Sequence, residues 1–162
     1  MLKRIALGLA VLAIAWFAYA ADSAPAAHPG VFTPKSMTWG PGPPFLPAGV
    51  KLAVLEGDPG KPGPFAVRLS MPNGYKIPPH NHPTTEHVTV ISGQFHLGMG
   101  DKFDAAKGTT LPAGSFGYLP AQMNHFAWSK GQTVVQVHGE GPFTITYVNP
   151  DDDPRKSAAS TP

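Results

Sequence analysis

The sequence predicts an all-β domain, an antiparallel sandwich or barrel, and three observations lead to this prediction. First, 20 Pro and 18 Gly in 162 residues interrupt the chain too often for long helices. Second, apolar and polar residues alternate from Phe65 to Met71, the period of a strand with one buried face. Third, short apolar runs follow one another between turn residues instead of alternating with helix-length segments. A chain of this length can bury one core, so we expect one domain.

Residues 1–20 have the three parts of a Sec-type signal peptide. Lys3 and Arg4 precede an apolar run over residues 5–20, which closes with the small-x-small cleavage pattern Ala18-Tyr19-Ala20. A membrane anchor is the alternative, but the run is shorter than the roughly 20 apolar residues that a spanning helix needs. We therefore expect cleavage after Ala20, a periplasmic or secreted protein, and no stable membrane anchor after cleavage.

The charge and cysteine content of the mature chain narrow the classes of partner. Cysteine is absent, which excludes disulfides and a lipid-modified cysteine at the cleavage site. Without Lys3 and Arg4, the 12 basic residues become 10, which equals the number of Asp and Glu. Nucleic acids and anionic membranes select clustered Lys and Arg instead of a balanced surface. We expect a small-molecule substrate or ligand and no nucleic-acid partner.

The segment before the predicted strands, residues 21–48, is rich in Pro, Gly and Ala. We expect it to be an N-terminal arm that lies over the core, with Phe32, Trp39 and Phe45 as anchors.

Residues 49–149 form the predicted barrel domain. Pro72-Asn73-Gly74 ends the first clear strand, and Ser92-Gly93 and Lys130-Gly131 are further predicted turns. The other predicted strands are 88–91, 94–99, 117–119, 125–129, 133–138 and 143–148. Residues 150–162 are predicted to be a disordered tail, in which three adjacent aspartates lack the spacing of a calcium loop and are expected to be solvated.

The segment from Gly74 to Glu86 contains the most informative group of residues. On an extended strand, residues two apart project from the same face, so His80 and His82 present two imidazoles to one point. Pro83 bends the chain after this pair, and a strand that resumes at Glu86 can direct its carboxylate back to the same point. On such a strand the neighbouring His87 points away.

Two imidazoles and a carboxylate are a suitable set for a first-row divalent metal ion. A histidine that is distant in sequence could complete the set. His125 is a candidate, because Gly114 opens a predicted strand that Pro120 ends shortly before His125.

These residues resemble the two motifs of the cupin superfamily. Gly74 to Gly93 resembles, position for position, the first motif, G-x5-H-x-H-x3-E-x6-G. Gly114 to Ser129 resembles the second, G-x5-P-x-G-x2-H-x3-N, but Gln122 replaces the glycine and Ser129 replaces the asparagine. The first departure affects the turn conformation and the second affects a structural polar contact, while neither removes a ligand.

The resemblance implies an RmlC-like jelly-roll β-barrel, or double-stranded β-helix, with a metal inside it. By likeness to the family, His80, His82, Glu86 and His125 hold one divalent transition metal ion, which could be Fe, Mn, Cu, Ni or Zn. The overall architecture looks like that of small, exported, single-domain bacterial cupins. Many cupins pair through edge strands, so the resemblance also brings a homodimer into consideration.

Three functions follow from this interpretation. The first is a dioxygenase-like metalloenzyme in which Glu86 could detach from the metal and act as a catalytic base. The second is a non-redox isomerase, lyase or hydrolase that uses the metal to polarise a carbonyl. The third is a non-catalytic periplasmic protein that binds metal or ligand, since four protein ligands complete a tetrahedral zinc site.

Other polar and aromatic residues near the motifs have no assigned role. His87 is expected on the outer face of its strand, and the sequence leaves the facing of His96 and His138 open. Gln136 shares a face with His138. We expect the aromatic residues around the second motif, Tyr118, Phe126 and Trp128, to belong to the core.

Overall fold

The structure is a computed structural model, and it describes residues 29–158. The expected signal peptide and the start of the expected arm lie outside the described residues. Within residues 29–158 nearly every regular element is a strand, which confirms the all-β prediction. The strands are β1 (Gly40–Pro41), β2 (Lys51–Glu56), β3 (Gly63–Met71), β4 (Lys76–Asn81), β5 (Glu86–Met99), β6 (Thr109–Pro112), β7 (Phe116–Leu119), β8 (His125–Gly141) and β9 (Thr146–Tyr147).

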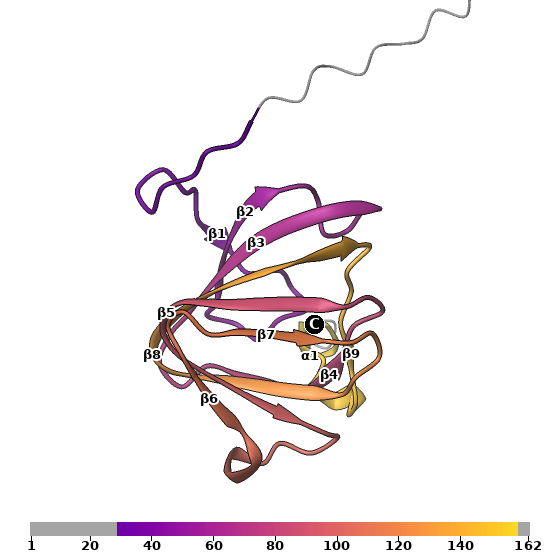
Figure 1. Ribbon diagram of the computed structural model, residues 1–162. Helices are drawn as coiled ribbons and strands as arrows, with labels where there is room; N and C mark the ends of the chain where they lie inside the picture. The colour runs from indigo at the N-terminus through magenta and orange to yellow at the C-terminus, as the bar shows by residue number, and fades with distance from the viewer. Residues whose placement is uncertain (1–28, 159–162) are drawn as a thin grey trace, which may run out of the picture.

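Two long strands, β5 and β8, pair along most of their length and connect two sheets. The first half of β5 pairs with the second half of β8 and with β7, while β3, β2 and β1 continue this sheet beyond β8. The second half of β5 pairs with the first half of β8 and with β6, while β4 and β9 continue that sheet. Figure 1 shows β2 and β3 on one side of the barrel and β6 on the other. This arrangement is the predicted jelly roll.

The two sheets are connected by bends at positions where the sequence predicted turns. Ser92-Gly93 lies at a register irregularity inside β5, and Lys130-Gly131 lies inside β8. Gly93 and Gly131 have φ values of 80° and 73°. These left-handed conformations bend the chain within one strand, so each predicted turn is a bend and the two strands predicted on either side of it are one long strand.

The core lies between the two sheets and follows the predicted alternation. Phe65, Val67, Leu69 and Met71 of β3 are buried, while the intervening residues are only partly covered. The opposite sheet contributes buried apolar residues that pack against the same interior: Ile77, Phe95, Leu97 and Ala127. Burial of such side chains is the main source of folding free energy in a domain without disulfides.

The described part of the arm, residues 29–48, is attached to the barrel at specific points. β1 pairs with β2, and the Tyr75 hydroxyl donates a hydrogen bond of 2.6 Å to the carbonyl oxygen of Pro47. Trp39 and Phe45 are partly buried, as expected for anchors. Phe32 is 45% exposed, so its assignment as an anchor was wrong. It precedes the first contact of the arm with the sheet.

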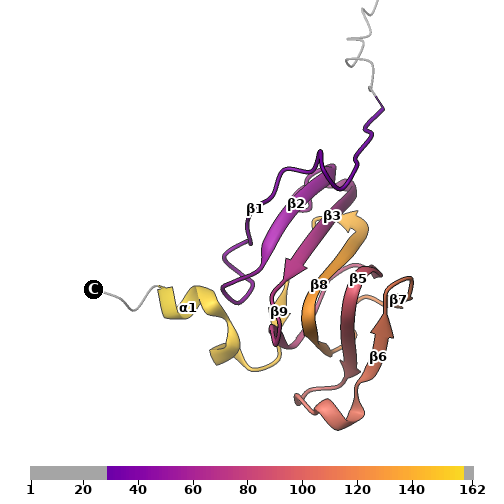
Figure 2. The same ribbon diagram turned by 90° about the vertical axis from the view of Figure 1, so that its left-hand side faces the viewer.

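Residues 150–158, the described part of the predicted disordered tail, contain two short helical elements. Pro150–Asp152 forms a 3-10 turn, and Pro154–Ala158 forms the short helix α1. Capping explains these elements, because the Asn149 side chain accepts from the Asp151 amide and Asp153 accepts from the Arg155 amide. Figure 2 shows α1 on the side of the molecule where the arm and β1 lie.

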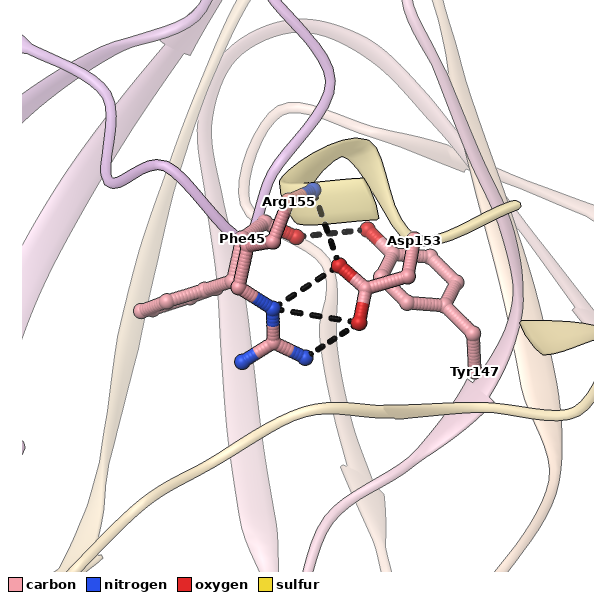
Figure 3. A network of polar contacts seen from close by, with 4 residues as sticks. All are labelled: Phe45, Tyr147, Asp153 and Arg155. Carbon is pink, nitrogen blue, oxygen red and sulfur yellow. Dashed lines mark hydrogen bonds and ion pairs between the residues drawn. The ribbon is translucent and has the colours of Figure 1, made fainter. Parts of the chain in front are cut away.

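Figure 3 shows the contact between the arm and β9, beside an ion pair within the C-terminal segment. The Tyr147 hydroxyl donates a hydrogen bond of 2.7 Å to the carbonyl oxygen of Phe45, and Arg155 forms an ion pair with Asp153 beside it.

Within residues 29–158, no helix has the length and apolar character needed to cross a membrane.

Candidate metal centre

Three histidine rings meet inside the barrel. One ring nitrogen of each of His80, His82 and His125 lies within 4.8 Å of the others. All three residues are buried, with 3%, 8% and 3% of their surface exposed. The ring centroids of His80 and His125 are 4.1 Å apart, and those of His80 and His82 are 5.0 Å apart. The structure thus brings together the three histidines that the two motifs supply.

Strand pairing explains how these residues meet. His80 lies near the end of β4 and is the pairing partner of His125, the first residue of β8. His82 directly follows β4, and Glu86 is the first residue of β5. All four expected ligands therefore lie at or next to the end of a strand, where the sheet fixes their backbones.

Backbone carbonyl groups orient the three rings. The Nδ1 atoms of His80, His82 and His125 lie 2.7, 2.7 and 2.9 Å from the carbonyl oxygens of Pro78, Thr144 and Met123. A carbonyl oxygen only accepts, so each Nδ1 carries the hydrogen and donates it. Each Nε2 is then left with a free lone pair, the state in which histidine binds a metal.

Glu86 lies beside this triad and is also buried. Its Oε2 is 3.2 Å from Nε2 of His125 and 3.6 Å from Nε2 of His82. Burial acts to raise the pKa of Glu86, but the adjacent His125 and His82 outweigh it and hold the pKa below its ordinary value. Glu86 is therefore an ionised carboxylate at neutral pH.

The electrostatics of the site favour a cation among these groups. Burial, with the neighbouring His125 and His82, lowers the pKa of His80 to about 3, and burial also lowers the pKa of His82. Two neutral imidazoles thus lie in a buried site together with a carboxylate from which water is largely excluded. Electron-rich atoms at these distances repel one another unless a positive species lies between them. A divalent metal ion fits this donor set, because imidazole and carboxylate are typical ligands of first-row ions.

A cavity of about 300 Å³ borders the centre. His80, His82 and Glu86 line one part of it, while Phe45 and Leu46 bring the arm into its wall. Phe143 also lines the cavity and stacks on His82 with a centroid distance of 4.1 Å. The expected metal ligands therefore face a space large enough for a small molecule.

The sequence matches the family of ChrR cupin-like domains over residues 27–144, most of the chain and both motifs. The protein belongs to this cupin family. The match confirms the resemblance to cupins, and the matched residues include the incomplete second motif. No curated protein sequence shows a significant match to this cupin.

Solved structures of other cupins share the fold at low sequence identity. A proposed acetylacetone dioxygenase from Methylibium petroleiphilum is 20% identical, with 83% of this chain and 96% of that chain covered and a TM-score of 0.59. An RmlC-like cupin from Shewanella frigidimarina is 16% identical, with 77% and 96% covered and a TM-score of 0.53. KdgF from Halomonas sp. is 16% identical, with 70% and 96% covered and a TM-score of 0.53.

The two departures from the second cupin motif keep the geometry that the motif residues provide. Gln122 replaces glycine and has a φ of 63°, a conformation that favours glycine, while its amide donates a hydrogen bond of 2.8 Å to the carbonyl oxygen of His82. Ser129 replaces asparagine and donates to the carbonyl oxygen of Pro72 at 2.6 Å. Its hydroxyl also accepts from the amide of Tyr75 at 3.1 Å. This cupin therefore retains the turn and the polar contact.

The remaining histidines of the described chain lie outside the centre. His87 is on the outer face, as expected, where its ring stacks on His138 with a centroid distance of 5.0 Å. His96 is buried against Trp128 at 4.7 Å and bonds to the Thr110 hydroxyl. These residues belong to the outer surface of the sheets, so none of them reaches the cavity.

The aromatic residues around the second motif differ in their burial. Phe126 is fully buried under Phe103, with a centroid distance of 4.9 Å. Tyr118 is 64% exposed, so its assignment to the core was wrong. It lies on β7 opposite His87, on the outer face of that sheet. Gln136 shares the outer face and accepts a hydrogen bond from Arg68.

The sequence did not identify two aromatic residues beside the triad as parts of the site. Phe143 stacks on His82, and the ring of Tyr147 lies 6.0 Å from that of His80. Neither position belongs to a cupin motif. Their position near the triad depends on the path of the chain after β8. The sequence shows only an apolar run there, which does not predict that path.

Proposed function

We propose that this cupin binds one divalent transition metal ion through His80, His82, His125 and Glu86 and acts on a small molecule as a dioxygenase-like enzyme outside the cytoplasm. The observation that carries the proposal is the convergence of three Nε2 lone pairs and an ionised carboxylate in a buried site beside a cavity. When bound, the metal supplies Lewis-acid and one-electron redox chemistry.

The residues of the chain supply orientation and proton transfer. The carbonyl groups behind His80, His82 and His125 fix the rings, which favours one ligand geometry. Glu86 is the candidate base, because its ionised Oε2 can accept a proton from a substrate hydroxyl or enol in the cavity. The apolar wall excludes water and strengthens these interactions.

The relatives support the reaction class by analogy of fold. The Methylibium protein is a proposed acetylacetone dioxygenase, and acetylacetone is a small β-dicarbonyl compound. We extend an oxygen-dependent reaction to this chain as part of the proposal. The proposal of export rests on the signal-peptide pattern of residues 1–20. On this proposal the protein would acquire its metal outside the cytoplasm.

A second candidate function is a non-redox or non-catalytic role with zinc. Four protein ligands complete a tetrahedral zinc ion and leave no open position, and Glu86 is close enough to His125 to be the fourth. In that role the protein would store or sense a metal, or polarise a carbonyl group after Glu86 has moved away.

Metal analysis followed by oxygen uptake tests the two candidates. We expect about one metal per chain in protein isolated from its native compartment, and oxygen uptake with β-dicarbonyl or polyphenol substrates after loading with Fe, Mn, Cu or Ni. The His125→Ala variant should show neither, and His87→Ala should show both. Stoichiometric metal without uptake for any of these ions would exclude the dioxygenase-like reaction. Turnover with zinc under anaerobic conditions would favour the non-redox reaction.

A further inference from the structure

The wall of the cavity beside the centre is apolar almost throughout. Apart from the expected ligands His80, His82 and Glu86, the residues that line it are apolar side chains, Gly60 and the exposed Asp58. Leu52, Val67 and Ile145 are examples from three different segments of the fold. An apolar wall favours an apolar ligand by about 25 cal/mol for each Å² of surface that leaves water.

The charges around the cavity are of one sign. Neither Lys nor Arg occurs among the described residues that line it, and the two ionisable acids there are Glu86 and Asp58. Asp58 forms an ion pair with Lys61 at 3.3 Å, and both side chains are exposed. A carboxylate or phosphate on a ligand would therefore lose its hydration without gaining a partner in the wall.

On the basis of the proposed metal site, we propose that the substrate is a small, uncharged, largely apolar molecule that carries one or two oxygen donors at one end. The oxygen donors lie toward His80, His82 and Glu86, and the apolar body fills the space between β2, β3 and the arm. Sugar acids, amino acids and phosphorylated compounds are disfavoured as substrates, because each carries more charges or hydroxyl groups than the centre can hold and the remaining ones would lie against the apolar wall.

The arm determines which apolar bodies fit. Phe45 and Leu46 form part of the wall, although they precede the barrel domain in sequence. Two buried phenols hold this segment, since Tyr147 donates to the carbonyl oxygen of Phe45 and Tyr75 donates to that of Pro47. The backbone at Phe45 is thus held by the same Tyr147 whose ring lies near His80. We assign Phe45 as a specificity-determining residue.

The charge preference is tested with two ligands that share the oxygen donors. The full chain purified from cells is loaded with zinc, so that binding is measured without turnover, and titrated calorimetrically with 4-methylcatechol and with 3,4-dihydroxybenzoate. We expect 4-methylcatechol to bind at least about tenfold more tightly than the carboxylate, and about fourfold more tightly than catechol itself, since it adds one buried methyl group. Equal or tighter binding of 3,4-dihydroxybenzoate would overturn the inference.

The role of the arm is tested with matched phenylalanine variants. Phe45→Ala should weaken binding of 4-methylcatechol at least about fivefold and should improve the relative binding of the bulkier 4-tert-butylcatechol. Phe32→Ala is the control, because Phe32 lies on the same arm but is exposed and away from the cavity. An equal effect of the two substitutions, or none, would remove Phe45 from the specificity determinants.

These measurements separate the substrate class from the reaction. Metal-free protein should also bind 4-methylcatechol more tightly than 3,4-dihydroxybenzoate, because the cavity alone then selects the ligand. If metal-free protein shows no such preference, the result would count against the proposed substrate class. Apolar selectivity without oxygen uptake keeps the substrate class and removes the dioxygenase-like function. Oxygen uptake with carboxylate substrates keeps the function and removes the substrate class.

Discussion

Oε2 of Glu86 lies 3.2 Å from Nε2 of His125, although 39 positions separate the two residues in the chain. The Nδ1 hydrogen of His125 is donated to the carbonyl oxygen of Met123, so Nε2 is the ring nitrogen that faces the carboxylate. A positive species between these two atoms, a metal ion or a proton, makes the contact favourable. The relationship between Glu86 and His125 is therefore the basis for the proposed metal centre.

Removal of a proposed ligand should weaken metal binding. We expect His125→Ala to lower zinc affinity at least about 100-fold, since it removes a nitrogen ligand, and Glu86→Gln to lower it at least about tenfold, since it removes the negative charge of the carboxylate. Competition with a chromophoric chelator measures both. His87→Ala is the matched histidine control, because its ring stacks on His138 outside the barrel. An effect of His87→Ala as large as that of His125→Ala would assign the binding to the outer surface.

The bend glycines of the two long strands should differ in their tolerance of a side chain. A Cβ atom on Gly93 would lie 2.4 Å from the carbonyl oxygen of Gln132, whereas one on Gly131 would meet nothing within 4 Å. Both residues have positive φ. Gly131→Ala should cost about 1 kcal/mol for its conformation alone, and Gly93→Ala about 3 kcal/mol because crowding is added. Urea unfolding measures the difference, and equal costs would contradict the close approach of Gln132 to the bend in β5.

Gln122 offers a substitution that should stabilise the protein. Its φ of 63° is strained for a residue with a Cβ atom, and glycine adopts it without that cost. We expect Gln122→Gly to raise the free energy of unfolding by about 0.5 to 1 kcal/mol while zinc affinity stays unchanged, because the contact to His82 uses the backbone amide. Differential scanning calorimetry would show this as a higher melting temperature. A lower one would indicate that the glutamine side chain stabilises the turn.

The phenols that hold the arm should make stability depend on alkaline pH. Burial raises the pKa of Tyr75 and of Tyr147 above the ordinary value of 10.0. Above that value the unfolded chain releases the two protons while the folded chain keeps them, so the free energy of unfolding falls as pH rises. Below about pH 10 the protein keeps the full contribution of the two buried phenols to its free energy of unfolding.

Unfolding by urea between about pH 8 and pH 11.5 measures this dependence. We expect Tyr147→Phe to reduce the slope above pH 10, since one of the two buried phenols is gone. Tyr118→Phe is the control, because Tyr118 is 64% exposed. If both variants keep the slope of the natural protein, another group is responsible for it.

The first cupin motif could be predicted from sequence because its residues are local. His80, His82 and Glu86 lie within seven residues. Strand periodicity predicts that His80 and His82 face the same side, and the bend at Pro83 allows Glu86 to return to them. The alternation in β3 likewise identified the buried face before its partners were known. In both cases the period of a strand fixes the direction of the side chain.

The cavity wall could not be predicted because it depends on distant contacts. Phe45 reaches the cavity only because the hydroxyl of Tyr147, 102 positions later, donates a hydrogen bond to its carbonyl oxygen. Predicted strand 143–148 is shortened to β9, since the carbonyl oxygen of Thr144 bonds to His82 instead of to a neighbouring strand. Such long-range partners leave no periodic signal in the sequence.

The most direct measurement of the central claim is anomalous diffraction from crystals of the metal-loaded protein, collected at the absorption edge of that metal. We predict one strong peak per chain between the Nε2 atoms of His80, His82 and His125 and the carboxylate of Glu86. A peak that lies elsewhere, or fully loaded crystals with no peak among these four side chains, would contradict the account.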